Sequence, residues 1–164
     1  MTTELTRLVA RMLLLPSFMV ALGVMIKGYA DVGDGFSAGV TAALGVALQI
    51  MAFGTQELSR LAVVRLAPRG TFLGLFIALL TAFVPAIRGQ ALFTHWPPAG
   101  EEAVHFGTLE FITAVAFDVG VFLVVFGFSV GVIASIARAQ ARLVSAQQRA
   151  QRLAEQGAKA GDAT

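Results

Sequence analysis

Apolar residues gather into four long blocks along the chain, and short polar or charged segments separate these blocks. A helix needs about 20 residues to cross a hydrocarbon core roughly 30 Å thick, and the blocks are close to or above that length. We expect transmembrane helices over residues 8–26, 36–54, 71–87 and 107–136. The pattern therefore predicts an all-α integral membrane protein with four transmembrane helices.

The segments between the blocks carry turn and interface signals. Residues 28–35 are glycine-rich, and Asp34 stands where an N-cap would start the second helix. Residues 55–70 are expected to form a polar connector, and residues 89–106 an outer loop in which Trp96 fits an interfacial anchor.

The part of the chain after the fourth block differs in composition. It is rich in alanine, glutamine and arginine, and we expect it to be helical to about residue 156 and disordered beyond. The sequence thus divides into a four-helix transmembrane domain over residues 1–136 and a basic tail over residues 137–164.

The basic residues are distributed unevenly between the two sides of the membrane. With four spans, the N-terminus, the second connector and the tail share one side, which holds ten of the twelve lysines and arginines. The other side holds only Lys27 and Arg88. Because basic residues concentrate in cytoplasmic segments, we expect both termini, and with them the helical tail, to be cytoplasmic.

Composition narrows the functional classes. Hydrophobic residues make up 57% of the chain and charged residues 13%, about half of the share in a soluble domain. The net charge of +2 gives little support to nucleic-acid binding, and the absence of cysteine excludes disulfides and thiolate metal sites. The two histidines are not in a ligand-spaced cluster, and we find no nucleophile–base pair or cofactor fingerprint. We expect no enzyme activity, cofactor or metal in the chain itself.

Small residues recur at four-residue spacing in two of the predicted helices. The second helix carries Gly35 and Gly39, followed by Ala43 and Ala47. The fourth carries Gly127, Gly131 and Ser135 at this spacing, with Ala116 and Gly120 one region earlier. Small side chains let helix backbones approach closely in a membrane. We expect these positions to be packing faces, either within the chain or against another subunit.

Asp118 is the acid that lies deepest in an apolar block. If residues 111–133 are embedded, Asp118 lies about 6 Å from the centre of the segment at ~1.5 Å per residue. An acid there costs roughly 2.5 kcal/mol or more, so it should face a partner or water. It is either part of a proton or cation relay or a structural acid bonded to a neighbouring helix. Glu110, two turns earlier on the same predicted helix, is a second ion-path candidate or a solvated end residue.

Two segments resemble a known family. Residues 117–127 (FDVGVFLVVFG), which open with Phe117, resemble the last-helix signature of the B subunit of Mrp-type multi-subunit Na⁺/H⁺ antiporters, the MnhB family. Residues 33–39 (GDGFSAG) resemble the glycine-rich start of the second helix of that family. The resemblance covers about residues 8–138.

The resemblance implies a small accessory subunit in the cell membrane of a prokaryote, working inside a Na⁺/H⁺ antiporter complex. Its partners would be the large antiporter-like A and D subunits, which are thought to translocate protons, and the small C, E, F and G subunits. The small subunits help to form a sodium path or hold the assembly together. The family motifs place the intramembrane acid at Asp118, packing positions at Gly120 and Gly127, and the helix start at Gly33, Gly35, Phe36 and Gly39.

Two other functions stay open at this point. The chain could be the equivalent subunit in the sodium-translocating module of a membrane-bound hydrogenase or a sulfur-reducing complex, where it would still bind no cofactor. It could also be a purely structural scaffold, in which case replacing Asp118 by asparagine would leave cation/proton exchange intact.

Overall fold

Four long helices make up nearly all of the described structure. The computed structural model describes residues 4–30, 33–54, 62–89, 105–106, 109–110 and 113–161. The helices are α1 (Glu4–Ala30), α2 (Gly35–Phe53), α4 (Ala62–Ile87) and α5 (Thr113–Gly161). All four are long and apolar enough to cross a membrane, which confirms the prediction of a helical chain with four candidate spans.

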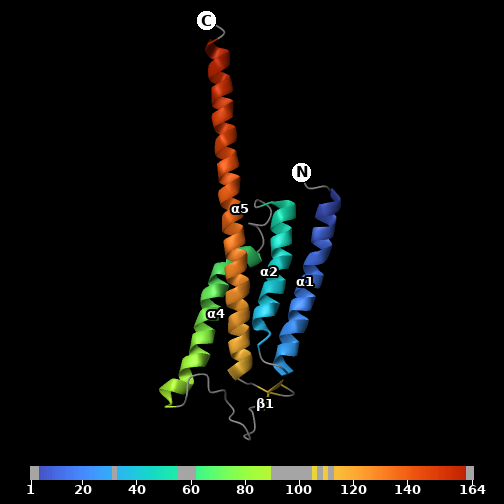
Figure 1. The fold of residues 1–164 in the computed structure, drawn as a ribbon, viewed down its shortest axis with the longest axis vertical. Coiled ribbons are helices and arrows are strands. Elements are labelled where there is room, and N and C mark those ends of the chain that lie inside the picture. The colour runs from blue at the N-terminus through green and yellow to red at the C-terminus, as the bar shows by residue number, and fades with distance from the viewer. Residues whose placement is uncertain are drawn as a thin grey trace.

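The helices pack in a row in which α5 occupies a central place. It lies against α4 on one side and α2 on the other, and α1 packs mainly against α2 (Figure 1). Both termini lie at the same end of this row, and α5 projects far beyond the other helices there (Figure 1). The antiparallel order of α1 and α2 follows from the short turn that joins them.

The start of α4 differs from the prediction. The helix begins at Ala62, so the part of the expected polar connector from residue 62 to residue 70 is helical. Pro68 lies inside the helix, and membrane helices tolerate proline where neighbouring groups compensate. Val64 and Ala67 are buried in the main apolar cluster, so the packing of this first part of the helix against α5 outweighs the breaker signal of Pro68.

The start of α5 also differs. Instead of a helix from residue 107, the strands β1 (His105–Phe106) and β2 (Leu109–Glu110) form a small antiparallel pair, and the helix begins at Thr113. Backbone groups engaged in this ladder cannot also join a helix. At its other end α5 continues unbroken through the expected tail to Gly161, over 49 residues. That is about 73 Å of helix, more than twice the thickness of a bilayer core.

The interior is built from small and β-branched side chains where α2, α4 and α5 meet. The buried cluster consists of Ala43, Val46, Ile50, Val64, Ala67, Val130 and Ala134. In contrast, most large apolar side chains of α1 and α4 are exposed. This is the distribution expected of helices that face lipid or other membrane subunits, because leaving lipid for a protein interior gains a large apolar side chain little.

Candidate functional site

The candidate site lies where the second turn of α5 passes the turn between α1 and α2. Asp118 is 6% exposed, and its Oδ2 accepts a hydrogen bond from the backbone N–H of Gly33 at 3.1 Å. Gly33 has φ +125°, a conformation that glycine adopts far more readily than other residues. The glycine-rich turn thus supplies the backbone donor that holds the buried carboxyl group.

A second acid lies beside Asp118. A Cβ atom placed on Gly28 would be 3.0 Å from the Cβ of Asp34 and 3.2 Å from Oδ2 of Asp118. The two acids therefore flank Gly28, and a larger residue there would crowd both. Lys27, one residue earlier, places its Nζ 3.3 Å from Oδ2 of Asp34.

The role expected of Asp34 changes in the structure. It occupies the N-cap position of α2, but its side chain makes no capping hydrogen bond. Its carboxylate pairs with Lys27 instead, and its carbonyl oxygen accepts a hydrogen bond of 2.9 Å from the hydroxyl of Ser37. Because the Lys27 side chain is 69% exposed, solvent screens the ion pair, which makes it a weak contributor to stability.

The structure places Asp118 early in α5, while its depth in a membrane stays a prediction. The residue lies only five positions after Thr113, about 7.5 Å along the helix, and its backbone contacts Gly35 at the start of α2. Asp118 is thus near one end of the helix row rather than near its centre.

Glu110 does not share a helix with Asp118. It lies on β2, ahead of the first turn of α5, so the expected arrangement of two carboxylates along one helix surface is wrong. The strand pairing of β1 and β2, which the apolar pattern did not reveal, is the reason.

The glycines of α2 bring this helix against α5. A Cβ on Gly35 would collide with the carbonyl oxygen of Asp118, and one on Gly39 would lie 3.1 Å from the carbonyl oxygen of Phe122. The side chain of Phe36 points away from this contact and is 61% exposed. The first turns of α2 therefore pack directly against α5 beside Asp118.

The glycines of α5 face α4. A Cβ on Gly120 would be 2.9 Å from the carbonyl oxygen of Gly74, and one on Gly127 would be 2.5 Å from that of Ala67. Apart from the backbone of its own helix, no atom of the described residues lies within 4 Å of the Cβ position of Gly131. Of the small residues expected to pack along this part of α5, Gly127 therefore meets another helix of the chain and Gly131 does not.

Two residues that join the helices were not foreseen from the sequence. Gly74 packs its backbone against Gly120, and the spacing of Gly70, Gly74 and Ala78 carried the same small-residue signal. Gln49 is buried, and its Nε2 donates a hydrogen bond to the carbonyl oxygen of Ala10. The signal for this link in the sequence was the presence of one amide side chain, that of Gln49, in the apolar block of α2.

The chemistry of the site is that of one buried carboxyl group beside an acid and an ammonium group. In the part of the chain that the structure describes, no three His, Cys, Asp or Glu side chains come together as a metal cluster. Asp118 can accept a proton, attract a cation, or fasten α5 to the turn through Gly33.

Comparison with known proteins identifies the family. Residues 5–131 match the family model described as "Domain related to MnhB subunit of Na+/H+ antiporter", which confirms the resemblance seen in residues 117–127. The chain is also similar to a protein of Rhizobium meliloti (strain 1021) named as the A/B subunit of a probable K(+)/H(+) antiporter, with 28% identity over 141 residues. That match covers 82% of this chain and only 13% of the relative. With four candidate membrane spans and a family match over most of its length, the chain belongs to the family of domains related to the MnhB subunit of Na⁺/H⁺ antiporters.

Proposed function

We propose that the chain is an accessory membrane subunit of a multi-subunit Mrp-type cation/proton antiporter, contributing to the ion path and to assembly. The observation that carries this proposal is the buried Asp118 carboxyl group, held by Gly33 at the α1–α2 turn in a chain of the MnhB family. The cations are Na⁺ and H⁺, and the chain acts without catalytic chemistry or cofactor of its own.

The partners are other membrane subunits, of the antiporter-like A and D types and the small C, E, F and G types. The large apolar side chains left exposed on α1 and α4 support such neighbours. The complex resides in the plasma membrane of a prokaryote with both termini of this chain in the cytoplasm, as the ten-to-two distribution of basic residues favours.

The first test is purification of the chain from its native membrane in mild detergent, with mass-spectrometric identification of the proteins that accompany it. Antiporter-like subunits without metal-cluster proteins are the expected result. Hydrogenase-like or iron–sulfur subunits would instead assign the chain to a redox complex, and recovery of the chain alone from a preparation that preserves other complexes would contradict the proposal.

The second test separates an ion-path role of Asp118 from a structural one. In Asp118→Asn the amide oxygen still accepts the hydrogen bond of Gly33, but the side chain no longer takes up or releases a proton. We expect the complex to assemble and to lose most of its Na⁺/H⁺ exchange, measured by pH-sensitive dye in vesicles. The matched control, Glu4→Gln, breaks the exposed pair with Arg7 at the other end of α1 and should keep exchange near the unmodified level.

Asp118→Ala provides the structural comparison. It removes the acceptor of the Gly33 N–H, and a buried group left unpaired costs about 1–3 kcal/mol, so we expect less assembled complex. Full exchange by a well-assembled Asp118→Asn complex would reject the ion-path role and leave the chain a scaffold.

A further inference from the structure

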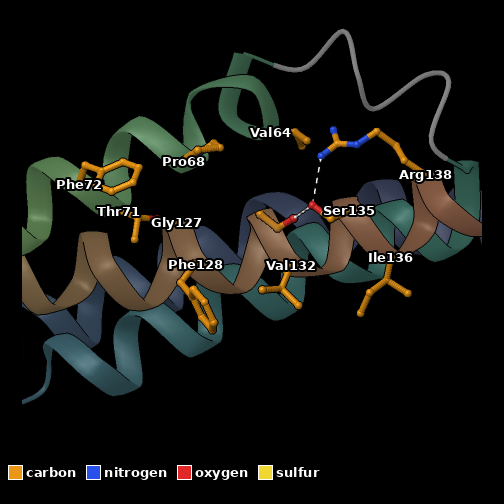
Figure 2. A pocket seen from close by; sticks show the side chains of 11 residues that line it. Val64, Pro68, Thr71, Phe72, Gly127, Phe128, Val132, Ser135, Ile136 and Arg138 are labelled. Carbon is orange, nitrogen blue, oxygen red and sulfur yellow. Dashed lines mark hydrogen bonds between the residues drawn. The ribbon is translucent and has the colours of Figure 1, made fainter.

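An apolar groove runs between α4 and α5, toward the end of the row that carries the termini. It has a volume of about 400 Å³ and is lined by Pro68 and Phe72 of α4 and by Phe128 and Val132 of α5, among others (Figure 2). Phe72 and Phe128 are 74% and 63% exposed, so the groove opens to the surroundings of the helices. Because no described residue beyond its own helix backbone lies within 4 Å of the Cβ position of Gly131, its missing side chain keeps the groove open.

One end of the groove is polar and positively charged. Nη2 of Arg138 lies 3.4 Å from the Oγ of Ser135, to which it donates, and that hydroxyl donates to the carbonyl oxygen of Gly131 at 2.7 Å (Figure 2). No acid balances Arg138 nearby among the described residues. The described part of α4 contains none, and the next acid along α5 is Glu155.

The groove spans the depth expected of a lipid chain. The apolar part of α5 ends just before Arg138, after which exposed charged residues follow, so Arg138 lies at the level of the head groups. Gly127, at the other end of the lining, is eleven residues earlier, about 16 Å deeper in the bilayer. The groove therefore runs from the head-group layer to about the middle of a core roughly 30 Å thick.

We propose that this groove binds an acyl chain of an anionic phospholipid whose phosphate lies at Arg138. A guanidinium group forms strong charge-assisted hydrogen bonds with phosphate oxygens, and basic pockets beside membrane helices suit anionic head groups. The proposal does not depend on the ion specificity of the complex.

The test uses the full chain in nanodiscs of phosphatidylcholine that contain a minority of phosphatidylglycerol with a photoreactive acyl chain. Mass spectrometry then locates the cross-links. We expect them to concentrate at Phe72, Phe128 and Val132, and to be fewer at the equally apolar, exposed Leu22 of α1. A phosphatidylcholine probe with the same photoreactive chain measures the preference for the anionic head group.

Two variants separate the charge from the shape of the groove. Arg138→Gln should lower the preference for the anionic probe about fivefold, the effect expected of one basic residue at the surface. The control Arg149→Gln, three turns farther along the exposed tail, should change it little. Gly131→Leu fills the groove without altering any charge, and should reduce cross-linking at Phe128 and Val132 by both probes.

Circular dichroism and gel filtration check that each variant remains folded. Cross-links spread evenly over all exposed apolar faces would overturn the proposal, as would an unchanged preference in Arg138→Gln. Protein–protein cross-links that place a helix of another membrane protein in the groove of the assembled complex, with lipid excluded, would overturn it as well.

Discussion

Glycine residues set the distance between α5 and its two neighbours. Gly35 brings α2 onto the backbone of Asp118, and Gly74 and Gly127 let α4 and α5 touch through carbonyl oxygens. In a membrane such close packing supplies much of the attraction that the hydrophobic effect supplies in water. At the scale of single residues, the stability of the helix packing should therefore depend more on these few glycines than on the large apolar side chains.

Replacing Gly127 by alanine tests this dependence. The new Cβ would lie 2.5 Å from both the carbonyl oxygen of Ala67 and Oγ1 of Thr71, so the helices would have to separate. We expect a loss of about 1–3 kcal/mol in the free energy of unfolding, measured by denaturant titration in detergent followed by helicity. The controls Gly23→Ala and Gly131→Ala add a methyl group where no other helix of the described structure lies within 4 Å, and a similar loss in them would contradict the packing argument.

One residue of the candidate site was predictable from the sequence, and its partner was not. Asp118 stood out because it is an acid in a long apolar block, and this signal needs no knowledge of the fold. Its partner Gly33 lies 85 positions away along the chain, a pairing that only the packing of α5 against the α1–α2 turn creates. The start of α5 at Thr113, after the β1–β2 pair, was not predictable from the apolar pattern.

Among the elements, α1 makes most of its helix contacts with a single neighbour. It packs mainly against α2, where Gly45 approaches Ser17 and the buried Gln49 bonds to the carbonyl oxygen of Ala10. Pro16 deprives α1 of one backbone donor, and the hydroxyl of Ser17 donates to the carbonyl oxygen of Leu13 at 2.8 Å. The attachment of α1 should thus be sensitive to the loss of a single polar link.

Gln49→Leu removes the donor at nearly constant volume. Side-chain hydrogen bonds between membrane helices contribute about 0.6 kcal/mol on average and up to about 1.7 kcal/mol, so backbone amides of α1 should exchange hydrogen roughly three- to twentyfold faster. Hydrogen–deuterium exchange with mass spectrometry measures this, and amides of α4 serve as the internal reference. Gln148→Leu, on the exposed tail, is the control; an equal effect in both variants, or none, would show that the link does not hold α1.

Element boundaries were predictable where the apolar blocks end at polar residues and not elsewhere. The range of α2 shifts by one residue from its prediction, Gly35–Phe53 against residues 36–54. The first turns of α4 were missed because Pro68 and the arginines beside it indicate a loop, whereas Val64 and Ala67 bury themselves against α5. At such places, tertiary packing outweighs the helix-breaking signals of the local sequence.

For the whole molecule, the distribution of basic residues along the chain matches the arrangement of the helices. The N-terminus of α1 and the long extension of α5 lie at one end of the row (Figure 1), and the basic residues on those segments lie there too. Lys27 and Arg88 lie near the chain turns that follow α1 and α4. An orientation with the termini in the cytoplasm places the arginine-rich end beside anionic head groups on that side.

Single cysteines can report this orientation directly because the natural chain has none. We expect Arg88→Cys to react with a membrane-impermeant maleimide on intact cells, and Ser145→Cys, on the exposed part of α5, to react only after permeabilisation. The reverse pattern would place the termini outside. Labelling of both in permeabilised cells is the control for reactivity.

The sequence by itself determined that the chain has four segments able to cross a membrane, because a bilayer demands about 20 apolar residues for each helix. It also determined the family, because residues 117–127 carry a specific pattern, and it singled out Asp118 as an acid worth testing. Only the tertiary structure decided that Gly127 packs while Gly131 borders an open groove, and that Asp118 bonds to Gly33 near one end of α5. The physical reason is that small-residue spacing is the same on a packed face and on an open one, so the distinction exists only once the partner surface is in place.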